Sequence, residues 1–589
     1  MDTPAAAARR DGRALLVRAL GGALAMFLVQ PPAGLWMLAW VAPVPWLLVV
    51  RDGCGAARRP WATLWLGGLV HWLLAVHWLR LPHPATSIGW VALSAYLGLF
   101  LPLFVWSARR LVVRHGWPIE AAAALAWAGC EQLRGTILGG FTLGSLGHTQ
   151  WRWTTLLQSA DWGGAPAVGA IVVLAAAALV TASGTVRGAV TQQRAAAGLL
   201  AAGLVLGGAL GYGRWRIAGA PADPRSLDVL LVQGSIDTEL KHDPEAAARV
   251  LEEYDGLTRA ALGDGPRPDL IVWPETMWRW PVIGIAADCR LPEDVVERVV
   301  GPRGTSDGES DASRQARSRA ILEQDRLDPL AAHARRYGAT WLVGVDRQQV
   351  PAAGLEATLH YNTALFLDAS GTPIGRYDKM FPVMFGEAVP LADRFPLLQR
   401  LTPLPVGLTA GDAPVAVTVA GLRVAPTICY ETALPDAIRG VVDVLAAAGA
   451  RPDVLVNLTN DGWFWGSSEL DMHLACGMFR AVEVRTPLAI AANTGFSAAI
   501  DGCGRLLERG PRRATGTIRR RLHPDGRVSP WLAVGPVAPA TCAGLVGLLV
   551  LLAALESRVR AAAASRAATL TAAQTLPSMT GGGDGLQDR

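Results

Sequence analysis

Eight apolar runs dominate this chain and limit what it can fold into. Each is close to the ~20 residues with which an α-helix crosses a hydrocarbon core of about 30 Å. Hydrophobic residues make up 51% of the 589 residues and the mean hydropathy is +0.28, which is too apolar for one soluble domain of this length. The sequence therefore predicts a polytopic α-helical membrane domain of about eight transmembrane helices. The runs lie at 14–30, 35–50, 62–79, 88–107, 118–133, 165–182, 195–212 and 537–555.

The arginines of the connecting loops predict how these helices are oriented. Cytoplasmic loops of membrane proteins carry an excess of Lys and Arg. When loops are taken alternately, one set with the tails holds fifteen arginines, whereas the other holds only Arg80, Arg134 and Arg152. We therefore expect both termini in the cytoplasm and the polar block between the seventh and eighth runs on the opposite side. The fifteen are Arg9, Arg10, Arg13, Arg51, Arg58, Arg59, Arg109, Arg110, Arg114, Arg187, Arg194, Arg558, Arg560, Arg566 and Arg589.

This orientation divides the chain into four parts. Residues 1–212 are predicted to be a transmembrane domain of about seven helices, and 213–536 an extracytoplasmic domain. Residues 537–555 form the returning helix, and 556–589, rich in Ala, Thr and Gly without an apolar period, are predicted to be a disordered cytoplasmic tail. A cleavable signal peptide is the alternative for the first run, but further runs follow so closely that we expect an uncleaved helix.

Short β-rich runs alternate with helical patterns in the polar block. Buried strands that alternate with helices indicate a layered α/β domain. The strand-like runs are 226–236, 268–275, 339–346, 422–431, 452–461 and 487–501, and the helical patterns are 244–263 and 470–485. Residues 284–318 are polar and, in their second half, rich in Gly and Ser, so they are predicted to be an inserted surface loop.

Two features of the sequence resemble motifs but predict no chemistry. Gly304-Thr305-Ser306-Asp307-Gly308 matches the G-x-S-x-G nucleophile elbow, yet no strand precedes it, so we reject the match. The seven cysteines include no C-x-x-C pair and therefore no zinc or redox motif. We expect no metal and no cofactor.

The formal charge of +5 arises largely from arginines between apolar runs and does not predict nucleic-acid binding.

Three reactive side chains follow β-rich or turn segments of the polar block. Glu275 follows LIVWP, Lys379 follows the polar turn ASGTPIGRYD, and Cys429 follows LRVAPTI. Residues at strand ends of a layered α/β fold meet at a shared rim. A carboxylate beside a thiol can accept its proton while the sulfur attacks a carbonyl, and an ammonium can stabilise the oxyanion that forms. Lys379 is one of only two lysines among 54 Lys and Arg residues, which favours a chemical role for it.

Each of these residues also has an ordinary structural interpretation. Cys429 alone would more often be a small packing residue. Lys379 could be a solvated loop charge, and Glu275 an acid in the first turn of a helix after Pro274. The joint occurrence of all three in this order favours acyl transfer.

At these residues the chain resembles a known family. Trp273-Pro274-Glu275, Tyr377-Asp378-Lys379 with Phe385-Gly386-Glu387, and Ile428-Cys429-Tyr430-Glu431 resemble the Glu-Lys-Cys motifs of the nitrilase superfamily, and in particular those of the apolipoprotein N-acyltransferase family. The resemblance spans nearly the whole chain. It includes Gln233-Gly234, Tyr361-Asn362-Thr363, Asn460-Asp461-Gly462-Trp463-Phe464, His473, Arg480-Ala481-Val482-Glu483, Asn493-Thr494-Gly495-Phe496-Ser497, Gly140-Phe141, Gln150 and Ala160-Asp161-Trp162-Gly163-Gly164.

The resemblance implies a fold and a reaction. The fold is a membrane domain of about eight helices with an outward-facing nitrilase-like αββα sandwich. The reaction moves an acyl chain from a membrane phospholipid to the thiol, and then to the α-amino group of a diacylglyceryl-cysteine at the amino terminus of an apolipoprotein. By match, Cys429 would be the nucleophile, Glu275 the general base and Lys379 the oxyanion stabiliser.

The same resemblance implies supporting residues and a location. Glu387 would orient or neutralise the lysine, Glu431 and Tyr430 would support the nucleophile loop, and Trp463 would contact lipid. For the two glutamates an ordinary ion pair is an equally good interpretation. The enzyme would be a monomer in the bacterial inner membrane, with its catalytic domain in the periplasm.

The chain also departs from the family pattern, and other functions stay open. Lys241-His242 stands where the family has Lys-Trp, and Met384 and Thr142 replace prolines. His473 shares a helical face with Arg480 and Glu483, which suits a structural network at least as well as catalysis. The rival functions are a membrane-anchored amidase of the same superfamily and a transporter or receptor with an outer binding domain.

Overall fold

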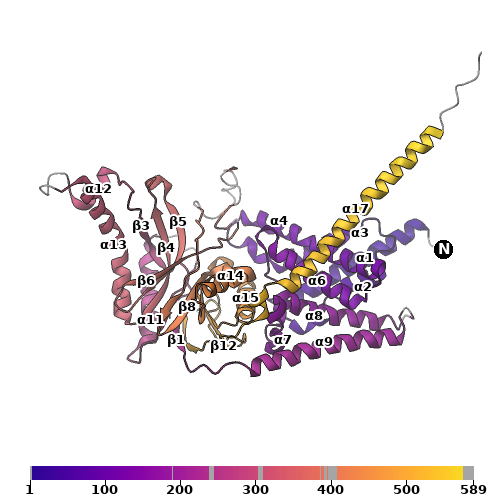
Figure 1. The fold of residues 1–589 in the computed structure, drawn as a ribbon, viewed down its shortest axis with the longest axis horizontal. Coiled ribbons are helices and arrows are strands. Elements are labelled where there is room, and N and C mark those ends of the chain that lie inside the picture. The colour runs from indigo at the N-terminus through magenta and orange to yellow at the C-terminus, as the bar shows by residue number, and fades with distance from the viewer. Residues whose placement is uncertain are drawn as a thin grey trace, which may run out of the picture.

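The computed structural model describes residues 3–186, 188, 190–237, 244–302, 309–384, 386–389, 394–395 and 407–574. Figure 1 shows an all-helical half, built mostly from the first 218 residues, beside a half that contains both helices and strands. Lys241, His242, Phe385 and the Gly304–Gly308 segment lie outside the described residues, so the predictions made for them are not addressed by the structure.

The helices of the helical half lie where the sequence shows apolar runs. Its core is lined by Leu, Val and Ala together with Trp46 and Phe104. The elements are α1 (Pro4–Leu28), η1 (Trp36–Trp40), α2 (Val44–Asp52), α3 (Pro60–Ala75), η2 (His77–Arg80), α4 (Thr86–Gly98), α5 (Phe100–His115), α6 (Ile119–Thr136), η3 (Ile137–Gly139), η4 (Gly147–Gln150), α7 (Thr154–Leu157), α8 (Ala160–Ser183) and α9 (Gln192–Ala218).

Four helical segments of the described chain are long and apolar enough to cross a membrane. They are Thr86–His115, Ala160–Ser183, Gln192–Ala218 and Val537–Ala567. The remaining predicted runs are also helical, but they are shorter or carry charges. The second run is split into η1 and the nine-residue α2, because Pro43 and Pro45 interrupt the backbone hydrogen bonding. The structure therefore supports four candidate spans and does not test the full count of eight.

The last helix, α17 (Val537–Gln574), packs along α6 and continues beyond the helical half (Figure 1). The prediction of disorder from residue 556 is therefore wrong as far as Gln574. Alanine and arginine, which favour helices, dominate this stretch. Its first turns are tied down because Glu556 pairs with Arg110 at 2.8 Å and with Arg114 at 3.2 Å.

The mixed half contains two β-sheets that pack face to face. The first has the strand order β13-β1-β2-β4-β5-β6, with β3 also paired to β4, and the second has the order β12-β11-β10-β9-β8-β7. The strands are β1 (Leu227–Gln233), β2 (Leu270–Val272), β3 (Trp278–Ile285), β4 (Thr340–Val350), β5 (Leu359–Leu367), β6 (Pro373–Asp378), β7 (Val417–Val419), β8 (Leu422–Ile428), β9 (Val454–Thr459), β10 (Leu488–Ala492), β11 (Ala498–Ile500), β12 (Leu506–Arg509) and β13 (Gly516–Leu522).

Helices cover the outer face of each sheet and complete four layers. The first sheet buries Trp273 and Trp341 against α11 (Ala247–Leu262) and α13 (Asp311–Tyr337). The second packs against α14 (Pro435–Ala447) and α15 (Glu469–Val484), whose far side meets Leu157 and Val168 of the helical half. Short helices η5 (Pro244–Ala246), α12 (Glu293–Val300), η6 (Leu355–Ala357), η8 (Cys429–Ala433), η9 (Asp461–Phe464) and α16 (Pro530–Val534) complete the chain. The expected αββα sandwich is present.

The predicted surface loop at 284–318 is wrong for most of its described residues. It contains α12 and the beginning of α13. The Ser310 side chain caps α13 by accepting a hydrogen bond from the Ser313 amide at 3.2 Å, and Gln315 accepts from the Leu291 amide at 2.9 Å. Polar residues thus form a capped, amphipathic helix here, although their composition predicted a loop.

A buried ion pair joins the two halves. Asp161, at the start of α8, is fully buried and pairs with Arg485, which follows α15 and is also fully buried. The same carboxylate lies 2.7 Å from Arg216 and accepts a hydrogen bond from Tyr212 at 2.8 Å. Removing one partner of such a pair leaves a charge without compensation in a dry environment.

We predict that Asp161→Ala lowers the free energy of unfolding by about 3–5 kcal/mol, the range for breaking a buried pair. Thermal unfolding of the purified protein in detergent measures this change. Asp294→Ala serves as the control, because its partner Arg298 and Asp294 itself are both 72% exposed and such surface pairs contribute little. Equal stability of the Asp161 and Asp294 variants would contradict the idea that this pair holds the halves together.

Candidate active site

Three strands end at one edge of the sandwich and bring the predicted triad together. Strands β2 and β4 are parallel, and β6 runs in the same direction because β4–β5 and β5–β6 are both antiparallel. Glu275 therefore follows β2, and Lys379 follows β6, at the same edge. The Lys379 Nζ lies 3.5 Å from Glu275 Oε1. Cys429 follows β8 of the second sheet, and its thiol interacts electrostatically with Glu275 and Lys379.

Two asparagines and the lysine fix the Glu275 carboxylate. Its Oε1 accepts a hydrogen bond from Asn362 Nδ2 at 2.6 Å, and its Oε2 accepts one from the backbone amide of Asn460 at 2.9 Å. Asn362 lies in β5 and Asn460 directly follows β9. Neither asparagine was predicted to have a role, although both stand in motifs that resemble those of the family.

Lys379 is almost fully buried between carboxylates. Its exposed fraction is 1%, and Glu387 contacts its Nζ through Oε2 at 2.7 Å and through Oε1 at 2.8 Å. Burial acts to lower the pKa of Lys379, but the carboxylates of Glu387 and Glu275 outweigh it and hold the pKa above its ordinary value. The group is therefore a permanent cation, suited to stabilising negative charge and unsuited to accepting a proton.

Cys429 sits on a sharp turn between β8 and η8. Its φ of 52° lies in the left-handed region, which is uncommon for a residue with a side chain. Burial, followed by the charge of Glu275, raises the pKa of the thiol, whereas Lys379 lowers it, and the balance lies well above the ordinary value. The sulfur is therefore held as a thiol, which would have to lose its proton before it could attack a carbonyl carbon.

Glu431 ties the lysine loop to the nucleophile turn. Its Oε1 accepts hydrogen bonds from Tyr377 Oη at 2.8 Å and from the amides of Met380 and Phe381 at 2.8 and 3.1 Å. Its Oε2 accepts from the Ile428 amide at 2.6 Å. The carboxylate is 1% exposed. These four bonds connect the residue that precedes Cys429 with residues on both sides of Lys379.

The nucleophile turn also touches the helical half. Tyr430 Oη donates to the carbonyl of Gly140 at 3.2 Å, and Thr142 donates to the carbonyl of Ala433. Ile137 and Leu138, just before Gly140, are exposed hydrophobic residues, as is Met384, whose methyl group lies beside Gly139. Trp463 lies half-buried in η9, and its contact with lipid stays a prediction.

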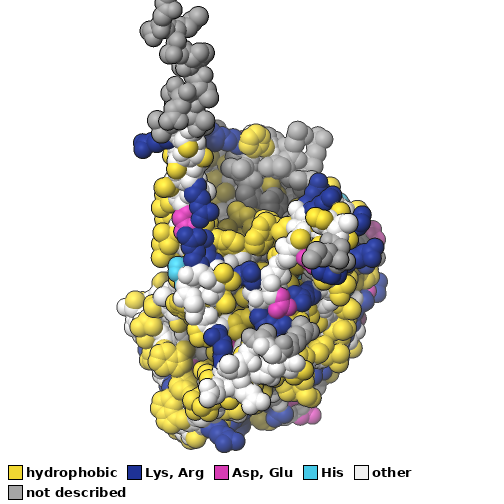
Figure 2. Space-filling model, turned by 90° about the vertical axis from the view of Figure 1, so that its right-hand side faces the viewer, with side chains coloured by type: hydrophobic (Ala, Val, Ile, Leu, Met, Phe, Trp, Pro, Cys, Tyr) yellow, Lys and Arg dark blue, Asp and Glu magenta, His cyan; other side chains and the backbone are white. Residues whose placement is uncertain are grey.

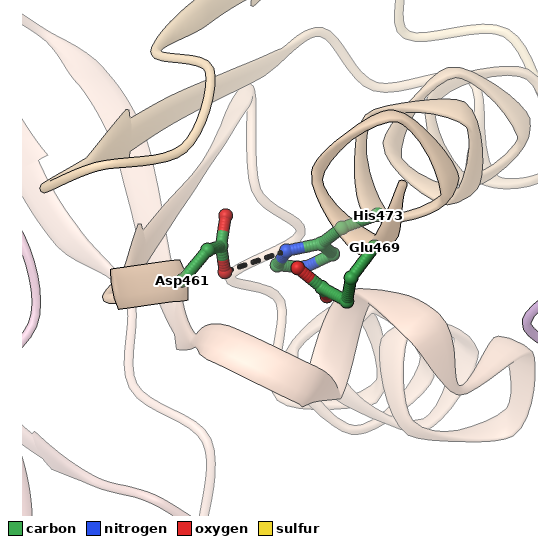
Figure 3. A group of neighbouring side chains, drawn as sticks. All are labelled: Asp461, Glu469 and His473. Atoms are coloured by element: carbon green, nitrogen blue, oxygen red, sulfur yellow. Dashed lines mark hydrogen bonds and ion pairs between the residues drawn. The ribbon is translucent and has the colours of Figure 1, made fainter. Parts of the chain in front are cut away.

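Three buried side chains near the triad could each offer a metal-ligand atom. The atoms of Asp461, Glu469 and His473 all lie within 4.8 Å of one another, and Figure 3 shows that Asp461 faces the imidazole. His473 Nδ1 is 3.2 Å from Asp461 Oδ1, while Nε2 is 2.6 Å from Thr432 Oγ1. Because both ring nitrogens already face oxygens, we interpret the group as an ion pair.

Arg480 and Glu483 of α15 form their own buried pair. Arg480 Nη2 lies 2.6 Å from Glu483 Oε1, and both side chains are fully buried. Burial raises the pKa of Glu483 to about 7, against the lowering effect of Arg480. Their contacts lie with each other rather than with the triad, so the structural interpretation of these two residues is preferred.

Two family models match different parts of the chain. Residues 232–526 match the family model "Carbon-nitrogen hydrolase", and residues 22–178 match "Apolipoprotein N-acyltransferase N-terminal domain". The sandwich is therefore a nitrilase-superfamily domain. The chain as a whole belongs to the apolipoprotein N-acyltransferase family, because curated members match most of its length.

Three such relatives are all named apolipoprotein N-acyltransferase. The protein of Rhodopirellula baltica is 28% identical over 89% of this chain and 95% of its own. That of Rhizobium meliloti is 32% identical over 83% and 86%, and that of Brucella melitensis 30% identical over 92% and 98%. Among solved structures, an amidase of the nitrilase superfamily from Nesterenkonia matches 53% of this chain and 96% of its own, with 17% identity and a TM-score of 0.34.

The charges around Cys429 predict how its thiol titrates. Because Glu275 raises the pKa of the thiol and Lys379 lowers it, Glu275→Gln should move the titration to lower pH, and Lys379→Met should move it to higher pH. The measurement is the pH dependence of iodoacetamide alkylation at Cys429, followed by peptide mass spectrometry to separate it from the other six cysteines. A downward shift in Lys379→Met would contradict the assigned electrostatics.

Proposed function

We propose that this protein transfers an acyl chain from a membrane phospholipid, through a thioester on Cys429, to the α-amino group of a diacylglyceryl-cysteine at the amino terminus of lipoproteins. The observation that carries the proposal is the cluster of buried Glu275 and Lys379 with the half-buried Cys429. The turn at Cys429 contacts the helical half through the hydrogen bonds of Tyr430 and Thr142. A site built in this way takes substrates from the membrane surface.

The first half-reaction loads the enzyme. As Cys429 Sγ attacks the ester carbonyl carbon, Glu275 accepts the thiol proton, and the oxyanion that forms is stabilised by the Lys379 ammonium. The carbon–oxygen bond then breaks, and Glu275 returns the proton to the departing glycerol oxygen. The products are a lysophospholipid and an S-acyl cysteine.

The second half-reaction transfers the acyl chain from the enzyme to the acceptor. The neutral amine of the acceptor attacks the thioester carbon, Glu275 accepts an amine proton, and Lys379 again stabilises the oxyanion. The carbon–sulfur bond breaks, the proton passes to the sulfur, and an amide and a free thiol result. Glu387 keeps Lys379 in place at 2.7 Å, and Glu431 keeps the two loops in register.

The proposal includes a topology. Eight spans, with both termini in the cytoplasm and the sandwich in the periplasm of the inner membrane, agree with the distribution of arginines. Arg109 donates to the carbonyl of Val50 at 2.9 Å, and Arg110 pairs with Glu556 at 2.8 Å, so three basic segments meet at one end of the helical half. Figure 2 views this end, which lies opposite the sandwich, and shows arginine side chains, drawn in dark blue, along α17 and across the surface.

The division of the chain that we propose follows from this topology. Residues 1–212 and 537–555 would lie in the membrane, and 213–536 would form the catalytic domain, acting as a monomer. Trp463, half-buried near the site, would contact lipid. A soluble-type amidase reaction, with water as acceptor, is less favoured because it gives no reason for joining the site to a bundle of apolar helices.

Substitutions of the triad test the proposal. Cys429→Ala should abolish transfer of a labelled acyl chain from phospholipid to a diacylated cysteinyl peptide, because it removes the thiol that interacts with both Glu275 and Lys379. Lys379→Arg should slow transfer by about 10²-fold or more, the scale for losing one oxyanion donor, because the planar guanidinium cannot occupy the position of the ammonium. Glu275→Gln should be comparably damaging.

The control for these variants is Cys289→Ala, which removes a buried thiol of the same domain and should leave transfer unchanged. Cys289 lies between β3 and α12, and its carbonyl accepts a hydrogen bond from Arg319 of α13 at 3.0 Å. Substantial transfer by Cys429→Ala would remove the thioester from the mechanism. Normal rates in Lys379→Arg at equal expression would assign that lysine a structural role.

A further inference from the structure

The nucleophile turn needs support that the triad does not supply. A residue with a side chain at φ 52° persists only where its surroundings hold it there. The charges of Glu275 and Lys379 act on the thiol of Cys429, whereas the backbone of the turn is held by Glu431 at the Ile428 amide and by further donors at the Cys429 carbonyl. The direction of the sulfur depends on this backbone.

Three donors converge on the Cys429 carbonyl oxygen. Asn457 Nδ2 lies 3.2 Å from it, Thr432 Oγ1 3.1 Å and His473 Nε2 3.2 Å. They come from β9, η8 and α15. Asn457 and Thr432 are fully buried and His473 is 5% exposed, so water does not compete for these bonds.

The geometry also defines the protonation of His473. Its Nδ1 faces the Asp461 carboxylate at 3.2 Å, and its Nε2 faces the Cys429 carbonyl. Nε2 also lies 2.6 Å from Thr432 Oγ1, whose single hydrogen is donated to the Cys429 carbonyl at 3.1 Å. With that hydrogen directed to the carbonyl, none of the oxygens around the ring donates to it, so both ring nitrogens carry hydrogen, which is the imidazolium form. The charges that face the ring are those of Asp461 and Glu469 (Figure 3), and together they outweigh burial and raise the pKa of His473 to about 9.

We propose that His473, held by Asp461, is a positioning residue that fixes the Cys429 turn and thereby directs the sulfur toward Glu275 and Lys379. Asp461 is itself oriented by Thr459 Oγ1, which donates to its Oδ1 at 2.7 Å. The chain of contacts runs from β9 through Asp461 and His473 to the nucleophile. This inference deepens the proposed function, because it rests on Cys429 being the nucleophile.

The test uses variants that keep or remove the Nε2 donor. His473→Leu removes it, His473→Gln retains an amide donor at nearly the same place, and Thr432→Val removes the hydroxyl that joins ring and carbonyl. We expect His473→Leu to slow single-turnover acylation of Cys429 by phospholipid by about 10²-fold, the scale for a small misplacement of a reacting group, with an unchanged KM for phospholipid. His473→Gln should recover most of the loss, and Thr432→Val should be intermediate.

Alkylation of Cys429 by iodoacetamide provides a second readout that needs neither lipid nor acceptor. It should slow in His473→Leu and recover in His473→Gln. The control is His333→Gln, which alters another His–Asp pair of the sandwich, 3.4 Å from Asp255, and should change neither rate. If His473→Leu does not fold, the comparison of His473→Gln and Thr432→Val with wild type carries the test.

Two outcomes would overturn the proposal. One is a wild-type alkylation rate in both His473→Leu and Thr432→Val. The other is a His473→Gln protein that is folded but as slow as His473→Leu. Failure of the proposed function is distinguishable, because it would appear as transfer activity in Cys429→Ala while the alkylation rates still report on the turn.

Discussion

The site depends on one buried cation. Taking an ammonium out of water is costly, and the Lys379 side chain is tolerated at 1% exposure because Glu387 and Glu275 lie 2.7 and 3.5 Å from it. The same contacts position the charge where an oxyanion would form. Strand β6 brings the lysine to the rim, and Glu431 joins its loop to the nucleophile turn through four hydrogen bonds. Removing this cation would leave the glutamates repelling each other beside the thiol.

The packing of the sandwich on the helical half joins the candidate site to the apolar helices. All residues of helix α15 except Asp471 are buried, with the second sheet on one side and α8 on the other. It carries His473, and Arg485 follows it to pair with Asp161 of α8. The element that supports the nucleophile turn is thus the one that anchors the sandwich, so the candidate site and the helical half keep a fixed relation.

Much of the site could be predicted from the sequence, because short hydrophobic runs mark the strands and the residues after each run mark the strand ends. The hydrophobic runs before Glu275 and Cys429 are strands β2 and β8, and α11 and α15 lie where helical patterns indicated. The residues of strand β6 were interpreted as a polar turn, because these largely exposed residues show little alternation of apolar and polar side chains. Asn362 and Asn460 were given no role, since an asparagine near a strand end is also typical of turns. Composition alone failed for α13 and for the extension of α17, where capping and ion pairs decide the structure.

The most direct test of the central claim is to incubate the enzyme with phospholipid in the absence of an acceptor and to measure its intact mass. The account predicts an increase of one fatty acyl group on the Cys429 peptide, which hydroxylamine removes and a diacylated cysteinyl peptide discharges as its own amine is acylated. A folded protein that shows no adduct, or one that steadily releases free fatty acid without an acceptor, would contradict it.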